Sequence, residues 1–132
     1  GYILNVSSLA AATPIPNQNV YAASKAYVLA FSQALANELK VVNSGISVTA
    51  LCPGFTATKM MDNPDQGARL SIPSMLLQPA REVAQQGIDA CLAGRSMWVP
   101  GLANRLTRWV AAVLPNGLLL PAVGRFYRKN MR

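Results

Sequence analysis

The feature that most constrains the fold of this chain is an alternation of short strand-like runs with longer helix-like segments. The strand-like runs cover residues 2–6, 46–52 and 96–99, and the helix-like segments cover residues 19–42 and 79–92. The runs are mostly apolar, as is typical of strands buried inside a sheet. Parallel strands need a long crossover, usually a helix, so this order predicts an α/β fold with a parallel sheet and right-handed connections.

Each helix-like segment carries apolar side chains at the helical period and a turn signal near its end. Asn17 or Asn19 is expected to cap the first helix, which should end before Gly45, and Gly94 should follow the second. The predicted core-facing residues are Val20, Val28, Phe31, Leu35 and Leu39 in the first helix, and Val83, Ala84, Gly87, Ile88, Cys91 and Leu92 in the second. Residues 10–18, which include two prolines, should form a loop.

Composition restricts both the size and the chemistry of the protein. With 132 residues, 52% of them apolar and 13% charged, the chain has the composition of one globular domain or a large piece of one. It contains no histidine, which excludes His-based triads, and Cys52 and Cys91 show no metal-binding spacing, so no metal site is expected. Unpaired cysteines, with no signal-peptide or membrane-spanning pattern in this sequence, favour a cytoplasmic protein.

Residues 55–79 combine prolines, methionines and scattered polar side chains. This composition predicts an irregular or partly helical lid, which could adapt to a substrate. Met60, Met61 and Met75 are flexible and apolar, so they suit either the lining of a hydrophobic pocket or the filling of a loop. The sequence favours neither interpretation.

Tyr21 and Lys25 lie four residues apart in a predicted helix, so their side chains project from the same face. An ammonium group beside a phenol favours the phenolate form, which makes Tyr21 a candidate general acid and base in a chain without histidine. Alone, this spacing also fits an exposed amphipathic pair. A serine ends the preceding strand and a Pro-Gly ends the following one, and such strand ends meet at one crevice in open α/β sheets.

With these residues the sequence resembles the short-chain dehydrogenase/reductase family, whose Tyr-x-x-x-Lys motif corresponds to Tyr21 and Lys25. In that family the serine stands thirteen positions before the tyrosine, which selects Ser8 rather than Ser7. The family's Pro-Gly-x-x-x-Thr motif corresponds to residues 53–58. Three motifs in register make the resemblance specific, and it covers residues 1 to about 100.

The resemblance implies an NAD(P)-dependent oxidoreductase that interconverts a carbonyl and a secondary alcohol, here on a hydrophobic substrate. In such an enzyme Tyr21 exchanges a proton with the substrate oxygen, Lys25 supports the phenolate and binds the nicotinamide ribose, and Ser8 stabilises the developing charge. The implied cofactor is NAD or NADP, and the implied cofactor-binding residues are Tyr21, Lys25, Pro53, Gly54, Thr56 and Thr58. Thr56 stands where the family often has Val or Ile, which matters little if only its backbone is used.

The resemblance implies the C-terminal portion of a Rossmann-like doubly wound sheet, with three strands, flanking helices and a helical tail. The chain begins without Met inside a strand, and the family's glycine-rich fingerprint and relay asparagine belong to the half that precedes it. We therefore expect this piece to be inactive alone, with a cofactor preference that its sequence does not reveal. The alternative is a catalytically silent module of the same family that serves oligomer contacts or membrane attachment. A homo-oligomer is expected through the helix that carries Tyr21.

Residues 101–132 are predicted to be an amphipathic, basic extension of the domain formed by residues 1–100, since the chain has seven basic side chains and no acidic one from residue 90 onward. Leu102, Leu106, Trp109, Val110 and Val113 share one helical face, and Pro115-Asn116-Gly117 should split the extension in two. Three interpretations stay open: packing over the substrate cleft or a dimer partner, contact with an anionic membrane surface, and attraction of an acidic substrate. Nucleic acid is not an expected partner, because aromatic and basic side chains are not interleaved.

Overall fold

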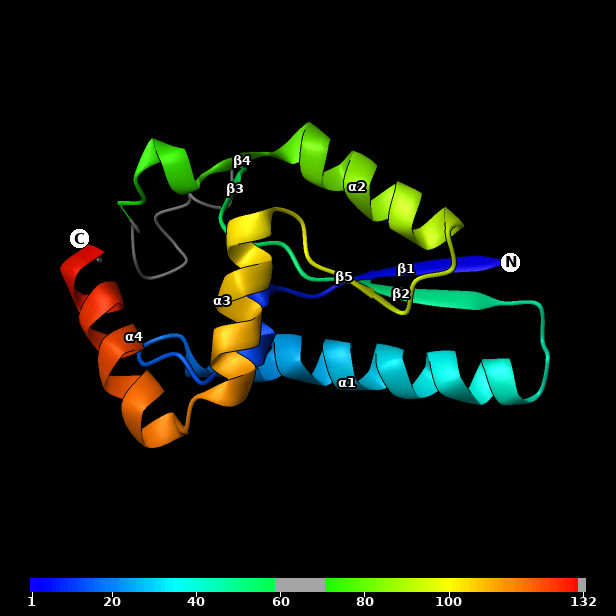
Figure 1. The fold of residues 1–132 in the computed structure, drawn as a ribbon, viewed down its shortest axis with the longest axis horizontal. Helices are drawn as coiled ribbons and strands as arrows, with labels where there is room; N and C mark the ends of the chain where they lie inside the picture. Colours follow the sequence, from blue (N-terminus) through cyan, green and yellow to red (C-terminus); the bar gives the residue numbers. More distant parts are fainter. Residues whose placement is uncertain (59–70, 131–132) are drawn as a thin grey trace.

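The computed structural model describes residues 1–58 and 71–130. Its centre is a parallel three-stranded sheet in the order β1-β2-β5. The strands are β1 (Tyr2–Val6), β2 (Ser47–Leu51) and β5 (Met97–Trp98). Helix α1 (Asn19–Val41) covers one face of this sheet, and α2 (Ala80–Leu92) covers the other (Figure 1). The predicted α/β architecture with three parallel strands is confirmed.

The middle strand β2 forms the core of the molecule. It pairs with β1 along its whole length, from Tyr2 opposite Ser47 to Val6 opposite Leu51. Every residue of β2 after Ser47 is buried, because helices cover both faces of the strand and other strands flank both of its edges. In contrast, β1 pairs on one side only within the described residues, and its Tyr2 and Val6 side chains are exposed.

Helix α1 packs on the sheet with a face that differs from the predicted one. Its buried residues are Ala22, Leu29 and Ser32. Val20 and Phe31, two of the predicted core residues, are exposed instead. Ser32 is small and polar, and it lies close enough to β1 for the Asn5 amide to donate a hydrogen bond to its Oγ at 3.0 Å. The buried face therefore combines Leu29 with two small residues, a mixture that apolar periodicity alone does not predict.

The start of α1 also differs from the prediction. The N-cap is Gln18, whose side chain forms no capping hydrogen bond. Asn17 adopts a left-handed backbone conformation with φ of 67°, which asparagine tolerates better than most residues. Asn19 Oδ1 accepts a hydrogen bond from the adjacent Val20 N–H instead of capping the helix from outside. Within the predicted loop, Leu9–Ala12 form a short 3₁₀ helix, η1.

Helix α2 buries Val83, Gly87, Ala90 and Cys91 against the sheet, which confirms part of the predicted stripe. Ile88 and Leu92, however, are exposed. Gly87 allows the close approach of α2 to β2, because a Cβ atom at this position would lie 2.6 Å from Leu51 Cδ2. The close contact between Gly87 and Leu51, rather than the apolar character of Ile88 and Leu92, therefore determines which face of α2 is buried.

The predicted lid is more regular at its ends than its composition suggests. Its described ends form a two-stranded parallel ladder of β3 (Thr56–Ala57) and β4 (Gln78–Pro79). A short 3₁₀ helix, η4 (Ser74–Leu76), precedes β4. Strands of two residues are too short to give a periodic pattern, so sequence alone could not reveal them. Met75 is exposed, whereas Met60 and Met61 lie outside the described residues.

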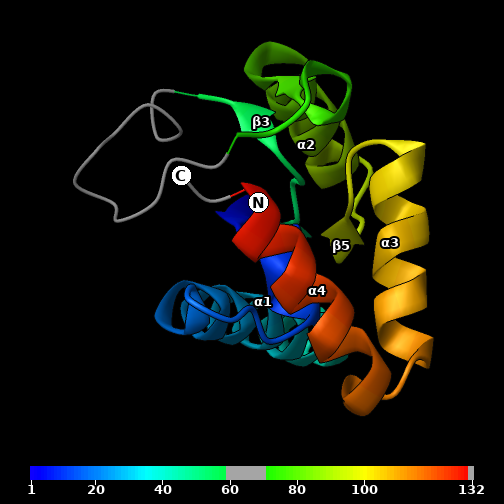
Figure 2. The ribbon, with the colours of Figure 1, turned by 90° about the vertical axis from the view of Figure 1, so that its left-hand side faces the viewer.

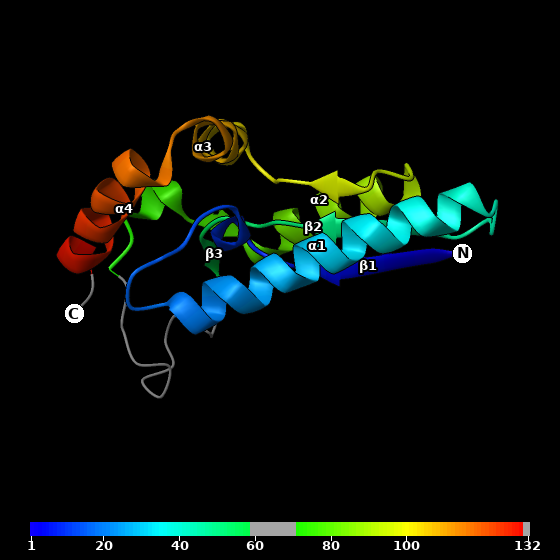
Figure 3. The ribbon, with the colours of Figure 1, turned by 90° about the horizontal axis from the view of Figure 1, so that it is seen from below.

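The extension forms two helices, α3 (Leu102–Val113) and α4 (Asn116–Asn130), which separate at Pro115 as predicted. Helix α3 runs across the edge of the sheet beyond β5, on the side away from β1 (Figures 2 and 3). Helix α4 lies at the end of the molecule toward which the strands point, with Gly124 and Tyr127 buried. Among the described helices, none is both long and apolar enough to cross a lipid bilayer.

A pair of glycine substitutions tests the contact between α2 and β2. Gly87→Ala should destabilise the fold, because overpacking typically costs about 1–3 kcal/mol while alanine adds only ~1 kcal/mol of helix propensity. Gly117→Ala is the matched control, since no atom lies within 4 Å of the added Cβ, and it should leave stability unchanged or raise it. Thermal unfolding measures both variants, and stabilisation by Gly87→Ala would contradict the close approach.

Candidate functional site

The end of β1 and the first turns of α1 are joined by two hydrogen bonds that run in opposite directions. Ser7 is buried at the end of the strand, and its Oγ donates to the backbone oxygen of Lys25 at 2.8 Å. In return, Lys25 Nζ donates to the backbone oxygen of Val6 at 3.1 Å. These bonds hold the ammonium group at the carboxyl end of the sheet.

The Lys25 ammonium lies beside the Tyr21 phenol. Its Nζ atom is 5.8 Å from the centroid of the Tyr21 ring, and both side chains are half-buried. A cation at this distance from an aromatic ring is within the range of a cation–π contact. The structure therefore brings the two side chains of the Tyr-x-x-x-Lys motif together at the end of β1.

The two serines after β1 occupy different environments. Ser7 points into the protein, whereas Ser8 is half-buried and caps η1 by accepting a hydrogen bond from the Ala10 N–H at 3.1 Å. A hydroxyl that accepts through a lone pair keeps its own proton for donation. Ser8 can therefore donate to a bound oxygen, while the Ser7 proton is committed to the Lys25 carbonyl.

Three hydrogen bonds fix the Pro-Gly segment after β2, two to its surroundings and one within the segment. The Pro53 oxygen accepts a hydrogen bond from Leu9 N–H at 2.7 Å, and the Phe55 oxygen accepts one from Gln78 N–H at 2.9 Å. Thr56 Oγ1 donates to the Gly54 oxygen at 3.2 Å. The strand ends that carry Ser8 and Pro53 are thus directly linked. Thr58 is exposed, one residue beyond β3.

Asn104 of α3 packs against the Pro-Gly segment at Gly54, a contact that the sequence did not reveal. Its Nδ2 donates to Gln78 Oε1 at 3.0 Å and to the Pro100 oxygen at 2.9 Å. A Cβ at Gly54 would lie 2.6 Å from both Asn104 Nδ2 and Oδ1, so only glycine leaves room for this side chain. The one signal in the sequence is Gly54 itself, which does not identify its partner.

Tyr127 of α4 is the second residue that sequence reasoning missed. It packs with Ile15 and Ala22 in a buried cluster, to which Phe55 and Val123 add partly buried side chains. Burial raises the pKa of Tyr127 to about 12, and the nearby Tyr21 adds to the shift. The C-terminal helix therefore brings a second phenol, neutral at physiological pH, close to the catalytic candidate.

Cys52 precedes the Pro-Gly segment and is almost fully buried. Burial raises the pKa of its thiol, while a hydrogen bond with Ser7 and the charge of Arg108 oppose the shift in part. The thiol therefore stays protonated at neutral pH, and protonated thiols are poor nucleophiles. This agrees with the interpretation of Cys52 as a small core residue.

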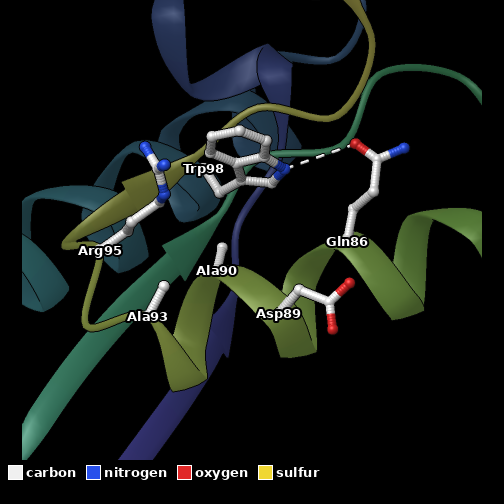
Figure 4. Close-up of a pocket in the computed structure, with 6 residues that line it drawn as sticks. All are labelled: Gln86, Asp89, Ala90, Ala93, Arg95 and Trp98. Carbon is white, nitrogen blue, oxygen red and sulfur yellow. Dashed lines mark hydrogen bonds between the residues drawn. The ribbon is translucent and has the colours of Figure 1, made fainter.

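A separate hollow of about 310 Å³ lies between α2 and β5 (Figure 4). Its lining residues are Gln86, Asp89, Ala90, Ala93, Arg95 and Trp98. Trp98 Nε1 donates to Gln86 Oε1 at 3.4 Å across it. None of the predicted catalytic or cofactor-binding residues lines this hollow.

A family model described as short chain dehydrogenase matches residues 1–68, just over half of the chain. The chain belongs to this family. Its relatives include human 15-hydroxyprostaglandin dehydrogenase [NAD(+)], which is 40% identical over 63 residues, or 48% of this chain and 24% of the relative. The very-long-chain 3-oxoacyl-CoA reductase of Anas platyrhynchos is 31% identical over 140 aligned positions, which cover 100% of this chain and 42% of the relative.

The structure resembles that of a short-chain dehydrogenase from Sphingobium yanoikuyae solved in complex with NADPH. The TM-score is 0.64 at 28% identity, with 90% of this chain and 44% of the other covered. The chain thus spans less than half the length of each of these three relatives.

The contact between Gly54 and Asn104 predicts a coupling between two substitutions. Gly54→Ala should destabilise the protein by about 1–3 kcal/mol, because the added methyl group overlaps the Asn104 amide. In an Asn104→Ala background the same change should cost measurably less, since the amide is gone. Thr107→Ala, one turn along α3, is the control background and should give no relief. Strict additivity of Gly54→Ala and Asn104→Ala would refute the contact.

The raised pKa of Tyr127 predicts a loss of stability at high pH. Below pH 10, Tyr127 is protonated in both the folded and the unfolded chain. Between pH 10 and 12 only the unfolded chain releases this proton, so the free energy of unfolding should fall by about 2 kcal/mol. Tyr127→Phe should lack this component, whereas Tyr27→Phe, at an exposed tyrosine, should retain it. Identical pH dependence of unfolding in all three proteins would contradict the assignment.

Proposed function

We propose that this chain forms the catalytic half of an NAD(P)-dependent oxidoreductase that interconverts a carbonyl and a secondary alcohol. The observation that carries the proposal is the position of Lys25, whose ammonium lies 5.8 Å from the centre of the Tyr21 ring and is held there by the Val6 carbonyl. Membership of the short chain dehydrogenase family supports it.

In the direction of reduction, a bound nicotinamide dinucleotide would supply the hydride that adds to the carbonyl carbon. Tyr21 then donates its proton to the carbonyl oxygen, so that the alcohol leaves neutral and the phenolate remains beside Lys25. The reverse reaction uses the phenolate as the base. Lys25 stabilises that phenolate electrostatically, which lowers the free energy of the charged state without a proton transfer of its own.

Ser8 is the proposed donor to the substrate oxygen. Its Oγ already accepts a hydrogen bond from Ala10 N–H, which orients the hydroxyl and leaves the proton for the substrate. A donor fixed before the substrate arrives stabilises developing charge more effectively than one that must reorganise. Ser7, which is buried and donates to the Lys25 oxygen, is a positioning residue in this proposal.

The residues proposed to hold the cofactor are Tyr21, Lys25, Pro53, Gly54, Thr56 and Thr58. The Pro-Gly segment fits the carboxamide of a nicotinamide, because its three hydrogen bonds fix backbone donors and acceptors in one arrangement. The exposed Thr58 hydroxyl is available to a phosphate group at the same edge. Relatives named for NAD(+) and solved with NADPH support either dinucleotide, and residues 1–132 leave that choice open.

A hydrophobic substrate is the finer part of the proposal. Phe55, directly after the Pro-Gly, faces Phe126 of α4 with ring centroids 6.2 Å apart, and Phe126 meets Tyr127 edge-on at 5.7 Å. These aromatic rings form an apolar wall next to Tyr21. The relatives named for a hydroxyprostaglandin and for a very-long-chain 3-oxoacyl-CoA point to substrates of similar character.

The outer face of α1 supports the proposed homo-oligomer. Val20, Tyr27 and Phe31 are all exposed on it, and the rings of Tyr27 and Phe31 stack with centroids 6.1 Å apart. An exposed apolar face of this kind is suited to a second copy of the helix. The same face would serve the alternative, a silent module that contributes only oligomer contacts. A cytoplasmic location remains part of this proposal.

Substitution of Tyr21 in the complete protein distinguishes between the two hypotheses, an active enzyme and a catalytically silent module. Tyr21→Phe should lower kcat by at least about a thousandfold, because the proton is needed in the transition state, while the Kd of the dinucleotide changes little. Lys25→Ala should weaken both turnover and dinucleotide binding. Tyr27→Phe, six residues along α1 on the exposed face, is the matched control and should remain active. Turnover by Tyr21→Phe at the wild-type rate would overturn the assignment.

A further inference from the structure

Helix α3 carries an apolar stripe that no described residue covers. Leu102, Leu106, Trp109 and Val113 follow one another at helical spacing, and each is between 61 and 80% exposed. Polar groups of the helix make its contacts with the protein instead. Asn104 bonds to Gln78, and Arg105, although exposed, donates from Nε to the Val99 oxygen at 3.0 Å. The large apolar side chains of this amphipathic helix thus face away from the protein.

The position of α3 separates this stripe from β1, the edge strand with which additional strands of the sheet would pair. The helix lies beyond β5, one edge strand of the three-stranded sheet, whereas β1 is the edge strand at the opposite side (Figure 3). Additional strands would pair with β1 and would therefore lie on the far side of the sheet from α3. The stripe needs another explanation.

Positive charge gathers next to the stripe. The guanidinium groups of Arg95 and Arg105 both lie over the Trp98 ring, at 4.8 and 4.2 Å from its centroid. Both side chains are exposed, and Figure 4 shows Arg95 beside the indole. Asp89 lines the hollow near Arg95, but its carboxylate accepts a hydrogen bond from Gln85. Residues 90–132 contain no acidic side chain to neutralise this charge.

We infer that α3 binds the surface of an anionic lipid bilayer, with its apolar stripe at the boundary between the headgroups and the acyl chains, and with Arg95 and Arg105 against lipid phosphates. An apolar helical face flanked by basic residues gains both from apolar burial and from attraction to anionic lipid. Association of two copies through this face would instead bring like charges together, which is unfavourable. The electrostatics therefore favour lipid over a second copy.

The test is co-sedimentation of the complete protein with vesicles of phosphatidylcholine alone or mixed with phosphatidylserine. Binding to the mixed vesicles should be stronger by about tenfold or more and should weaken as salt is added. The double variant Leu106→Ser and Trp109→Ser should lose most of that binding. The control is Val41→Ser with Val42→Ser, which removes similarly exposed apolar side chains from the C-terminal end of α1 and should bind like the wild type.

Arg95→Gln with Arg105→Gln should reduce the preference for anionic vesicles and its salt dependence, while circular dichroism and thermal unfolding verify the fold. Equal binding to both vesicle types, no binding, or unchanged binding by the Leu106 and Trp109 variant would overturn the inference. A change of oligomeric state in that variant without lipid would assign the stripe to a second copy and would also overturn it. None of these readouts depends on turnover, so the result is independent of the proposed reaction.

Discussion

The arrangement of the candidate site depends on the junction between β1 and α1. Two hydrogen bonds cross this junction: Ser7 Oγ donates to the Lys25 oxygen, and Lys25 Nζ donates to the oxygen of Val6, the residue before Ser7. A lysine side chain has many rotamers, and ordering it costs conformational entropy. The hydrogen bond to the end of β1 already orders this side chain in the folded protein. The ammonium is therefore in place beside Tyr21 before any ligand binds.

The second strand extends this fixed region to the segment proposed to hold the nicotinamide. Ser7 N–H donates to the Leu51 oxygen and Leu9 N–H donates to the Pro53 oxygen, both at 2.7 Å. The parallel register therefore continues past the end of β2 into its Pro-Gly turn. The candidate residues at the ends of β1 and β2 are held by one backbone network, which explains why their spacing in the sequence is informative although they belong to different strands.

Structural features formed by residues near one another in the sequence could be predicted, whereas the contacts made by the extension, residues 101–132, could not. The three strands of the central sheet, both sheet helices, the break at Pro115 and the pairing of Tyr21 with Lys25 follow from local pattern. Asn104 and Tyr127 contact residues far away in the sequence, and nothing local indicates these partners. The buried face of α1 was misjudged because it includes the small residues Ala22 and Ser32, while periodicity favours large apolar ones.

The tail itself resolves into two helices with different roles. Helix α4 buries Tyr127 and Gly124 against the protein, in the cluster that also contains Ile15 and Ala22. Helix α3 contacts the Pro-Gly segment through Asn104 and leaves its apolar side chains exposed. A single straight helix could not do both, because one apolar face cannot be buried on the protein and exposed at the same time. The break at Pro115 separates the two, so that α4 packs against the domain while the stripe of α3 stays exposed for the lipid contact that we propose.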